Sequence, residues 1–575
     1  MTGLLEYKHY FPLDSIQKVC DLFEEQLRSN KEADLALFSI IVGAVENNLT
    51  NVKNSDKEVN LHSNKFVKIK FPSVEWDDVK KLHERFVSLM RSGVDSKLLN
   101  APYATRDLVK RVADVVWNSL TRSYYKDRAH LQSIYSFLTG NKLDCFGVAF
   151  AVTAGCQVLG KQDVHLALSE DHAWVVFGKD GTETAEVTWH GKGNEDKRGR
   201  SVGEGVSACS WLYVAGKPVV CTRLMELAAL VSSINPTLTP TIDVHEVAQM
   251  QHKLLWLLYD NGHLDAYPMA LGNLGDLDEY MKNASGDADI SLPIGNINST
   301  KTDGTVRPDS AALYAQAIRS SRTYYEDRHV YPYTFQGGYY HRHKMYKEAF
   351  HAWACAGDVI RHYNYSRDDE EIYKEFSEIA NELIPQLMKA ESSGHSARSI
   401  LKDPECFASL LRFYDGICKW EEGSQTPILH IGWAKPLVST ISKFDSEVRA
   451  QVHIICRPNA DENLDESKDV NAEKKEEKEN VNDKWNSNGE NAEMSVREQL
   501  TAAVNSRPRV TLYSHKMAAL KPLLLAERLN THALQLQLTA QSQLQRPQTT
   551  TKRRDDDDQS QSVPTARAKR ARRER

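Results

Sequence analysis

The chain has 575 residues, with 72 Lys and Arg against 78 Asp and Glu, so its formal charge is only −6. This length exceeds what a single hydrophobic core supports, and we expect several domains. The hydrophobic content of 41% fits a folded protein. No apolar run reaches the roughly 18 residues of a membrane span, and the N-terminus lacks a signal-peptide pattern, so we expect a soluble intracellular protein without membrane contacts.

The nine cysteines are scattered singly, and no two of them are spaced as Cys-x-x-Cys. Zinc sites normally draw on closely spaced cysteines or histidines, and disulfide frameworks need an even set in a secreted chain. Gly191-Lys192-Gly193 lacks the spacing of a phosphate-binding loop. We therefore expect no structural metal, no disulfide framework and no cofactor.

Residues 1–92 are predicted to form a helical N-terminal domain, with one short strand at 67–71, where apolar and basic side chains alternate. Residues 93–221 are predicted to mix helices and strands. The expected helices cover 108–120, 131–138 and 145–159, and the expected strands cover 164–168, 173–177 and 184–189. A helix followed by an antiparallel meander, with a cysteine at the helix start, is typical of a papain-type core.

Residues 222–400 are predicted to form a helical domain with tetratricopeptide-like motifs. In the best-fitting segment, Gly337 and Ala349 would let two helices approach while Trp353 fills the gap between them. The other residues at the packing positions of this repeat are Tyr333, Tyr340 and Ala356. Ordinary helical hairpins fit the same periodicity about equally well. The fold class is therefore mainly α with a smaller α+β part.

Residues 401–456 and 509–546 are predicted to form a C-terminal region that a charged segment interrupts. Over residues 461–480, 13 of 20 side chains are charged, so we expect residues 457–508 to be a disordered acidic loop. The alternation of Leu with polar residues at 534–539 predicts a half-buried strand. Residues 547–575 are expected to be a disordered basic tail.

Cys145, His172 and residue 188 follow the chain order of transglutaminase-type thiol enzymes, in which a helix-start cysteine precedes a strand histidine and then a carboxylate. The helix start favours the thiolate, the imidazole takes its proton, and the carboxylate orients the imidazole. Here Thr188 occupies the carboxylate position, and Glu186 on the same strand face could substitute for it. We expect a degenerate site without enzymatic activity. The alternative is a thiol acyltransferase or peptidase that uses Cys145 and His172.

Glu371, Glu375 and Glu378 lie at i, i+4 and i+7 of a predicted helix and therefore share one face. Such a stripe is usually solvated. The sharper hypothesis is a receptor for Arg side chains of a partner, because bidentate Arg–carboxylate pairs fix register as well as attract. The aromatic residues between Tyr324 and Tyr340 would then wall a groove for a basic, aromatic-containing peptide.

The C-terminal tail carries two basic clusters, and six of its last ten residues are Lys or Arg. This pattern indicates a nuclear import signal and allows nonspecific contact with DNA phosphates. No aromatic residue interleaves the last cluster, so base stacking is not expected. The candidate import residues are Lys552, Arg553, Arg554, Lys569, Arg570, Arg572 and Arg573.

Several long runs of this sequence resemble the menin family of nuclear scaffold and tumour-suppressor proteins. These runs include residues 114–120, 122–130, 165–178, 186–196, 254–260, 267–274, 364–376 and 403–424. The resemblance extends from residues 11–13 to residues 536–543, and only the acidic loop and the extreme C-terminus do not match. It implies that 93–221 is a transglutaminase-like domain, 222–400 a tetratricopeptide-like palm, and 401–456 with 509–546 a fingers region.

The resemblance also implies that the protein is not an enzyme and that it binds short Arg/Phe-Pro-containing peptides in a deep central cavity. The implied partners are the N-terminal peptide of a mixed-lineage-leukaemia-type histone methyltransferase, a JunD-type transcription factor and a chromatin-tethering coactivator, in the nucleus, where the protein would regulate transcription. The implied peptide-binding residues are Asp171, His172, Ala173, Ser232, Tyr267, Met269, Asn273, Tyr331, Phe335, His341, Trp353, Glu371, Glu375 and Glu378.

The chain departs from better-known members of the family at several of these positions. Ala229 replaces Phe, Thr334 replaces Met, Phe335 replaces Tyr and His341 replaces Cys. We expect these changes to leave the peptide-binding mode intact and to alter affinity for particular ligands. Cys145 stands where better-known members have Ser, so this chain retains a thiol that they lack.

Overall fold

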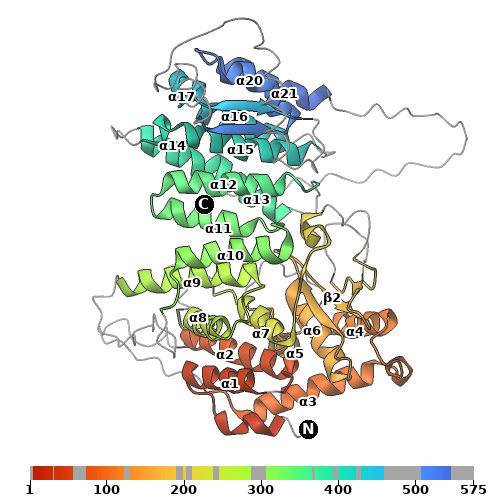
Figure 1. Cartoon of the computed structure of the whole chain (residues 1–575). Coiled ribbons are helices and arrows are strands. Elements are labelled where there is room, and N and C mark those ends of the chain that lie inside the picture. The colour runs from red at the N-terminus through yellow and green to blue at the C-terminus, as the bar shows by residue number, and fades with distance from the viewer. Residues whose placement is uncertain are drawn as a thin grey trace, which may run out of the picture.

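A computed structural model describes most of the chain, and Figure 1 shows its helices stacked from an N-terminal base to a C-terminal top. The described residues are 4–29, 31–55, 73–121, 130–188, 198–202, 210–236, 245–286, 306–364, 370–392, 399–422, 429–458 and 507–544. The predicted strand at 67–71, nearly all of the expected acidic loop and all of the basic tail lie outside these residues.

Three helices form the base of the molecule: α1 (Ile16–Arg28), α2 (Leu35–Ser55) and α3 (Trp76–Gly93). α1 begins after Ser15, whose hydroxyl oxygen accepts a hydrogen bond from the Lys18 N–H. The first two turns of α2 bury both apolar and small side chains, which makes this helix the centre of the lower core. The prediction of a helical N-terminal segment is confirmed for its described part.

The next segment adds three helices and a small sheet. The helices are α4 (Arg106–Asn118), α5 (Ile134–Gly140) and α6 (Cys145–Val158). The strands are β1 (His165–Leu168), β2 (Ala173–Phe177), β3 (Glu183–Ala185) and β4 (Val219–Val220), in the antiparallel order β3-β2-β1-β4. A 3₁₀ turn at Trp211–Gly216 precedes β4. The predicted helices and the strands β1 and β2 are confirmed.

The third predicted strand, at 184–189, is wrong in its length, because β3 ends at Ala185. The Glu186 carboxylate turns back on its own chain and accepts hydrogen bonds from the N–H groups of Val187 and Thr188, at 3.1 and 3.0 Å. Those N–H groups are therefore unavailable for a strand ladder.

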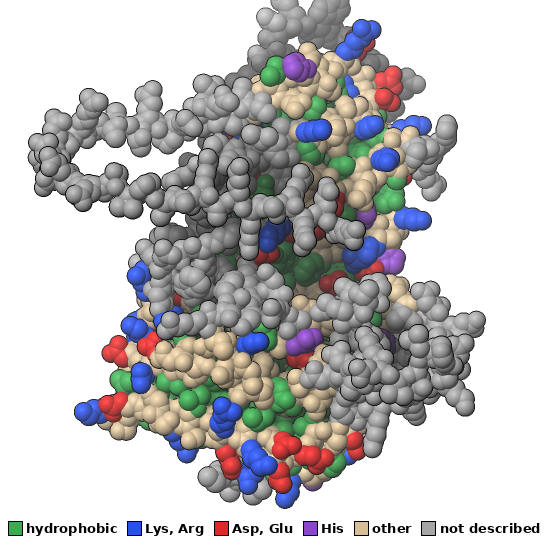
Figure 2. Space-filling model, turned by 180° about the vertical axis from the view of Figure 1, so that it is seen from behind, with side chains coloured by type: hydrophobic (Ala, Val, Ile, Leu, Met, Phe, Trp, Pro, Cys, Tyr) green, Lys and Arg blue, Asp and Glu red, His purple; other side chains and the backbone are tan. Residues whose placement is uncertain are grey.

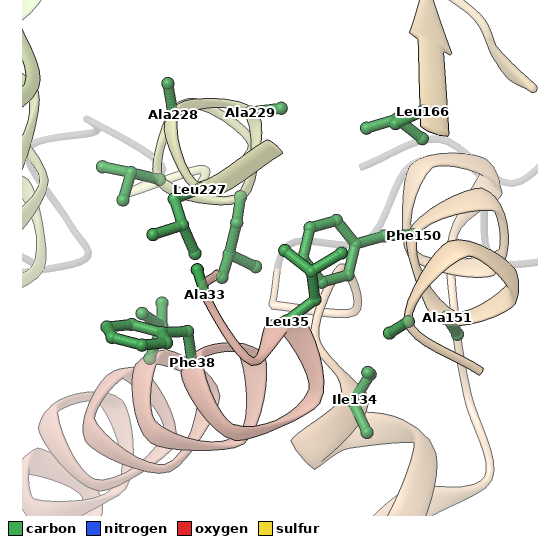
Figure 3. Close-up of a cluster of buried hydrophobic side chains, with 14 of the residues drawn as sticks. Ala33, Leu35, Phe38, Ile134, Phe150, Ala151, Leu166, Leu227, Ala228 and Ala229 are labelled. Carbon is green, nitrogen blue, oxygen red and sulfur yellow. The ribbon is translucent and has the colours of Figure 1, made fainter. Parts of the chain in front are cut away.

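The lower core joins the base to the sheet without a break. Figure 3 shows side chains from the base helices, the sheet segment and α7 (Arg223–Ser232) meeting in one cluster, with α7 above it. The labelled members include Leu35 and Phe38 of α2, Ile134 of α5, Phe150 of α6, Leu166 of β1 and Leu227 of α7. One continuous core thus runs from Tyr7 to Tyr325.

The middle of the chain is helical, as predicted. Its helices are α8 (His245–Asp260), α9 (Pro268–Gly286), α10 (Ser310–Tyr325), α11 (Tyr331–Arg342), α12 (Tyr346–Ile360), α13 (Glu370–Glu378) and α14 (Ile384–Ser392), with a π turn at Ile379–Leu383. Gly337 of α11 is required by Trp353 of α12, because a Cβ at residue 337 would lie 2.4 Å from the Trp353 indole nitrogen. The predicted close approach of these two helices is confirmed.

The top of the molecule contains α15 (Pro404–Glu421), α16 (Leu429–Ile441), α17 (Ser446–Ala450), α20 (His515–Leu524) and α21 (Thr531–Leu544). β5 (His453–Cys456) and β6 (Arg509–Leu512) pair in parallel there. A second core fills this part and begins within the middle helices, where it includes Tyr333 and Trp353.

The predicted strand at 534–539 is wrong, since these residues lie in helix α21. Leu534 and Leu538, one helical turn apart, are buried, while Leu536 between them is 54% exposed. Asn530 accepts a hydrogen bond from the Ala533 N–H at 3.0 Å and supports the start of the helix. The alternating leucines therefore include a buried i, i+4 pair on one face of a helix, Leu534 and Leu538, and an exposed leucine between them.

Within the described part of the chain, no helix combines the length and apolar character that would let it cross a membrane. The described residues also contain no group of three or more His, Cys, Asp or Glu side chains placed to hold a metal ion.

Candidate functional site

A cavity of about 360 Å³ opens where α6, the turn before β2, α7, α9 and α11 meet. On the face of the molecule seen in Figure 2, hydrophobic side chains lie in a hollow near mid-height, with charged and histidine side chains at its edge. The cavity is lined by Asp144, Cys145, Phe146, Leu168, Ser169, Glu170, Asp171, His172, Ala173, Ala229, Ser232, Ser233, Tyr267, Met269, Asn273, Asp276 and Phe335.

The structure brings many of the predicted peptide-binding residues to this cavity, from segments far apart in the sequence. Those that line it are Asp171, His172, Ala173, Ser232, Tyr267, Met269, Asn273 and Phe335. Tyr331 lies one turn from Phe335 on α11, and the two rings stack at 5.5 Å with an angle of 14°. Tyr331 thus backs the aromatic wall of the cavity.

Trp353 and His341 are among the predicted residues that lie outside the cavity lining. Trp353 is fully buried in the upper core and packs against Gly337, so the structure assigns it a packing role. The His341 ring lies 5.9 Å from the Trp353 ring and is not part of the cavity lining. Burial, and then the neighbouring charge of Arg342, lower the pKa of His341.

Glu186, and not Thr188, holds the carboxylate position beside His172. Glu186 Oε2 lies 2.8 Å from His172 Nε2 and accepts a hydrogen bond from the Tyr213 hydroxyl at 3.1 Å. The Thr188 hydroxyl donates to Glu186 Oε1 at 3.0 Å. The expectation that Thr188 is the third member of the site is therefore wrong, and the substitute considered from the sequence occupies that place.

The surroundings of Glu186 keep it ionised. Burial is the largest influence and opposes ionisation, but the charge of His172 and the hydrogen bonds from His172 and Thr188 together outweigh it and lower the pKa of Glu186. Both side chains of the pair are almost completely buried. The pair is thus fixed at the cavity wall, with His172 in the lining and Glu186 behind it.

Cys145 is the first residue of α6 and lines the same cavity as His172. Asp144 caps this helix, because its Oδ1 accepts a hydrogen bond from the Gly147 N–H at 2.6 Å. Burial raises the pKa of Asp144 to about 6. The structure therefore brings a thiol and an imidazole to one cavity and places the Glu186 carboxylate 2.8 Å from the imidazole.

Glu170 joins the sheet segment to the middle helices, a role that sequence reasoning missed. Its carboxylate accepts hydrogen bonds from the N–H groups of Val330 and Tyr331, at 2.9 and 2.6 Å, and from the Trp211 indole at 2.7 Å. It thereby caps the start of α11 from 160 residues away in the chain. Burial raises the pKa of Glu170 to about 7.

The cavity wall formed by α7 and α9 carries polar groups that hydrogen-bond to one another. The Asn273 side-chain amide donates to the Ser232 carbonyl oxygen at 2.9 Å and to the Ser232 hydroxyl at 3.2 Å. Burial raises the pKa of Tyr267 far above its usual range. Met269 and Phe335 supply apolar surface beside these groups, so this wall would contact a ligand mainly through apolar packing.

Asp276 and Glu375 carry negative charge from the cavity toward α13. Burial raises the pKa of Asp276, which lines the cavity, to about 6. Burial also raises the pKa of Glu375, which is partly buried. The charges of Glu378 and Asp276 raise this pKa further, and a hydrogen bond from the Thr334 hydroxyl lowers it. The two carboxylates are therefore electrostatic neighbours, and Asp276 is a site residue that no sequence signal marked.

The other members of the predicted acidic stripe differ in setting. Glu371 lies 3.0 Å from Lys374 Nζ on the same helix, and Glu378 is exposed. Burial raises the pKa of Tyr331, and the charges of Asp171, Glu170, Glu375 and Glu371 raise it further. The stripe thus begins beside the aromatic wall and runs outward to solvent, although none of the three carboxylates is part of the cavity lining.

Comparisons with known proteins agree with this architecture. The family model described as Menin matches residues 4–506 and 499–570, ranges that include the acidic segment and most of the tail, where we expected no resemblance. A solved structure, a crystal structure of menin that reveals the binding site for Mixed Lineage Leukemia (MLL) protein, is 44% identical to this chain with a TM-score of 0.69. The similarity covers 92% of this chain and 99% of that one. This chain therefore belongs to the menin family.

Proposed function

We propose that this chain is a non-enzymatic nuclear scaffold that binds Arg/Phe-Pro-containing peptides in its central cavity. In this role it would link a mixed-lineage-leukaemia-type histone methyltransferase complex to transcription factors and so regulate transcription. The observation that carries the proposal is the cavity itself, whose aromatic and apolar lining continues into a row of carboxylates. The similarity to a menin whose MLL-binding site is known supports the same partner class here.

The chemistry of the cavity fits such a peptide in two parts. Phe146, Met269 and Phe335 offer apolar surface that a Phe-Pro pair would bury. Asp171 and Asp276 in the lining, with Glu375 beyond them, offer carboxylates to cationic side chains. An anionic ligand would meet like charge at these carboxylates, and a purely apolar ligand would desolvate them without adding a hydrogen bond, which is costly.

The other partners rest on the resemblance alone. A JunD-type transcription factor would compete for the same cavity, and a chromatin-tethering coactivator would join through the methyltransferase complex. The tail residues Lys552, Arg553, Arg554, Lys569, Arg570, Arg572 and Arg573 would direct nuclear import and could add nonspecific DNA contact.

Calorimetry with a synthetic peptide containing Arg beside Phe-Pro tests the proposal. The double variant Glu371→Lys, Glu375→Lys should bind about tenfold or more weakly, because partner Arg side chains would meet like charge. The matched control is Glu25→Lys, Glu84→Lys, which makes the same change in net charge at exposed positions of the base helices α1 and α3. Equal affinities for the two double variants would contradict the proposed role of the stripe.

The alternative function is a thiol acyltransferase or peptidase. One observation favours it, because Glu186 provides beside His172 the carboxylate that is missing at residue 188. Such an enzyme would release ammonia or an amine from an amide substrate with Cys145 as the nucleophile. Ammonia release from a glutamine-containing peptide that exceeds the rate of the Cys145→Ala variant would support it. Equal rates of ammonia release for the wild type and Cys145→Ala would exclude this alternative function.

A further inference from the structure

Two turns with left-handed backbone meet where the sheet segment joins the middle helices. The first follows Trp211, in the 3₁₀ turn before β4, where Val214 and Ala215 have φ angles of 51° and 49°. The second joins α10 to α11, where Glu326 and Asp327 have φ angles of 52° and 57°. Residues with a Cβ rarely adopt positive φ, and successive ones do so less often still, so both turns carry backbone strain.

Contacts between the sheet segment and the middle helices hold these turns together. Lys217, which follows the first turn, has its Nζ 3.0 Å from Glu326 Oε1 of the second turn. The Trp211 and Tyr331 rings pack in a T-shaped arrangement, with their centroids 5.5 Å apart. The Trp211 indole N–H donates to Glu170, which also accepts hydrogen bonds from two N–H groups at the start of α11. These groups form one connected unit, the latch, made up of Glu170 and residues 211–217 and 326–331.

The latch joins the two hydrophobic cores and is fixed on both sides. Trp211 is buried in the upper core, whereas Val219, which follows the first turn, is buried in the lower core. The Tyr333 hydroxyl donates a hydrogen bond to Asp327 Oδ1 at 2.8 Å, which ties the second turn to α11. Strained backbone persists only where surrounding contacts hold it, so these contacts offset the strain while the latch is closed.

Strain lowers the free energy needed to open the latch locally, because opening lets the left-handed residues return to their preferred backbone regions. Opening also separates the start of α11 from Glu170. Glu170 lines the cavity, and α11 carries Phe335 in the same lining. We propose that the latch opens as one unit, without global unfolding, and that its opening detaches the start of α11 from the cavity wall. The inference is independent of what the cavity binds, since it rests on the contacts of the latch.

Such opening would give the cavity a way to admit and release a ligand. A molecule that contacts both Glu170 and Phe335 would favour the closed arrangement, in which both residues line one cavity. Its residence time would then depend on how often the latch opens. A latch that is strained when closed opens more often than an unstrained one with the same contacts, so the left-handed residues would set this rate.

Hydrogen exchange on the full chain, resolved to single amides by mass spectrometry, tests local opening. The reporters are the N–H groups of Val330 and Tyr331, which Glu170 accepts, and the reference is the N–H of Phe150, in the middle of α6. The reporters should be at least about tenfold less protected than Phe150, and their protection should fall less steeply with urea, because local opening exposes less surface than global unfolding. Equal protection and equal urea dependence for reporters and reference would overturn the proposal.

A matched pair of substitutions isolates the effect of strain. Glu326→Gln removes the ion pair with Lys217 and keeps a side chain in the left-handed conformation. Glu326→Gly removes the ion pair and also the strain, because glycine adopts positive φ freely. Glu326→Gly should therefore protect the Val330 and Tyr331 N–H groups about fivefold better than Glu326→Gln does. Equal protection in the two variants would contradict a contribution of strain.

Ala215→Gly tests whether the two turns open together. It relieves strain in the first turn only, so a latch that opens as one unit should show about threefold better protection at Val330 and Tyr331, in the second turn and the start of α11. A gain confined to the first turn, such as at the Lys217 N–H that is hydrogen-bonded within it, would overturn opening as one unit.

Discussion

The two walls of the cavity hold their carboxylates in different ways. On the sheet side, Glu170 accepts three hydrogen bonds and Glu186 pairs with a buried histidine while accepting bonds from four further donors. On the side of the middle helices, beyond the cavity lining, Glu375 is partly buried with the Thr334 hydroxyl beside it, and Glu378 is exposed. The first set of carboxylates therefore holds the architecture together, and under the proposed function the second set would meet a ligand.

This difference separates effects on stability from effects on binding. Removing a sheet-side carboxylate leaves buried donors without an acceptor, so the cost falls on the fold. Under the proposed function, removing a carboxylate on the side of the middle helices should leave the fold intact and lower the affinity for a cationic partner.

The largest expected effect follows from Glu170→Ala. Two backbone N–H groups and the Trp211 indole lose their acceptor, so the free energy of unfolding should fall by roughly 2–4 kcal/mol. The variant should also speed hydrogen exchange at the Val330 and Tyr331 amides. Asp180→Ala, in the exposed turn between β2 and β3, is the control and should change neither quantity. Unchanged exchange at Val330 would contradict the capping role.

The pH dependence of stability should distinguish Glu170 from Glu186. The pKa of Glu170 is raised from 4.5 to about 7, so the folded state holds a proton that the unfolded state releases, and this contribution to stability declines as pH rises from 4.5 to 7. The pKa of Glu186 is lowered from 4.5, so its contribution is present above pH 4.5 and is lost as pH falls below that value.

Urea denaturation across this range, on wild type and on Glu170→Gln and Glu186→Gln, checks these signs. Glu170→Gln should flatten the decline between pH 4.5 and 7, and Glu186→Gln should flatten the loss below pH 4.5. The assignment of the two pH ranges would be wrong if Glu170→Gln changed the pH dependence below 4.5 or Glu186→Gln changed it between pH 4.5 and 7.

Peptide binding should depend on the ionisation of Asp276. Because the pKa of Asp276 is about 6, affinity for an Arg-containing peptide should fall as pH is lowered from neutral through 6. Asp276→Asn should bind several-fold more weakly at neutral pH, with a flatter pH profile. Calorimetry in two buffers of different ionisation heat would detect the proton released on binding near pH 6. Asp180→Asn serves as the control, and matching profiles for wild type and Asp276→Asn would argue against this role.

The smallest expected effect is that of Thr334→Val. It removes the hydroxyl that lowers the pKa of Glu375, so the carboxylate becomes harder to ionise and binding weakens by about twofold at neutral pH. The effect should vanish at high pH, where Glu375 is ionised in both proteins. A loss of affinity that persists there would point to a packing role for Thr334.

The sequence predicted the helical elements and the residues of the cavity better than it predicted the roles of individual groups. Amphipathic spacing and small-residue positions located α6, α11 and α12, and the pairing of Gly337 with Trp353 follows from size alone. The same reasoning placed a strand at 534–539, because alternating leucines fit a strand until tertiary packing buries only Leu534 and Leu538.

The missed site residues share a physical cause. Glu170 and Asp276 act through partners that are distant in the sequence, at Val330 for the former and at Tyr314 for the latter. No local pattern marks such a carboxylate, since its role depends on which helix start or hydroxyl the fold brings to it. Trp353 was predicted on two grounds, and its burial against Gly337 confirms the gap-filling role that residue size alone indicated.

The most direct test is photo-crosslinking with an Arg/Phe-Pro peptide in which benzoylphenylalanine replaces Phe. The account predicts that mass spectrometry will find the crosslink at the apolar lining, at Met269 of α9 or close to Phe335 of α11, and that unlabelled peptide will suppress it. A crosslink that falls mainly on the base helices α1 to α3, or on the outer face of α15, would contradict binding in this cavity.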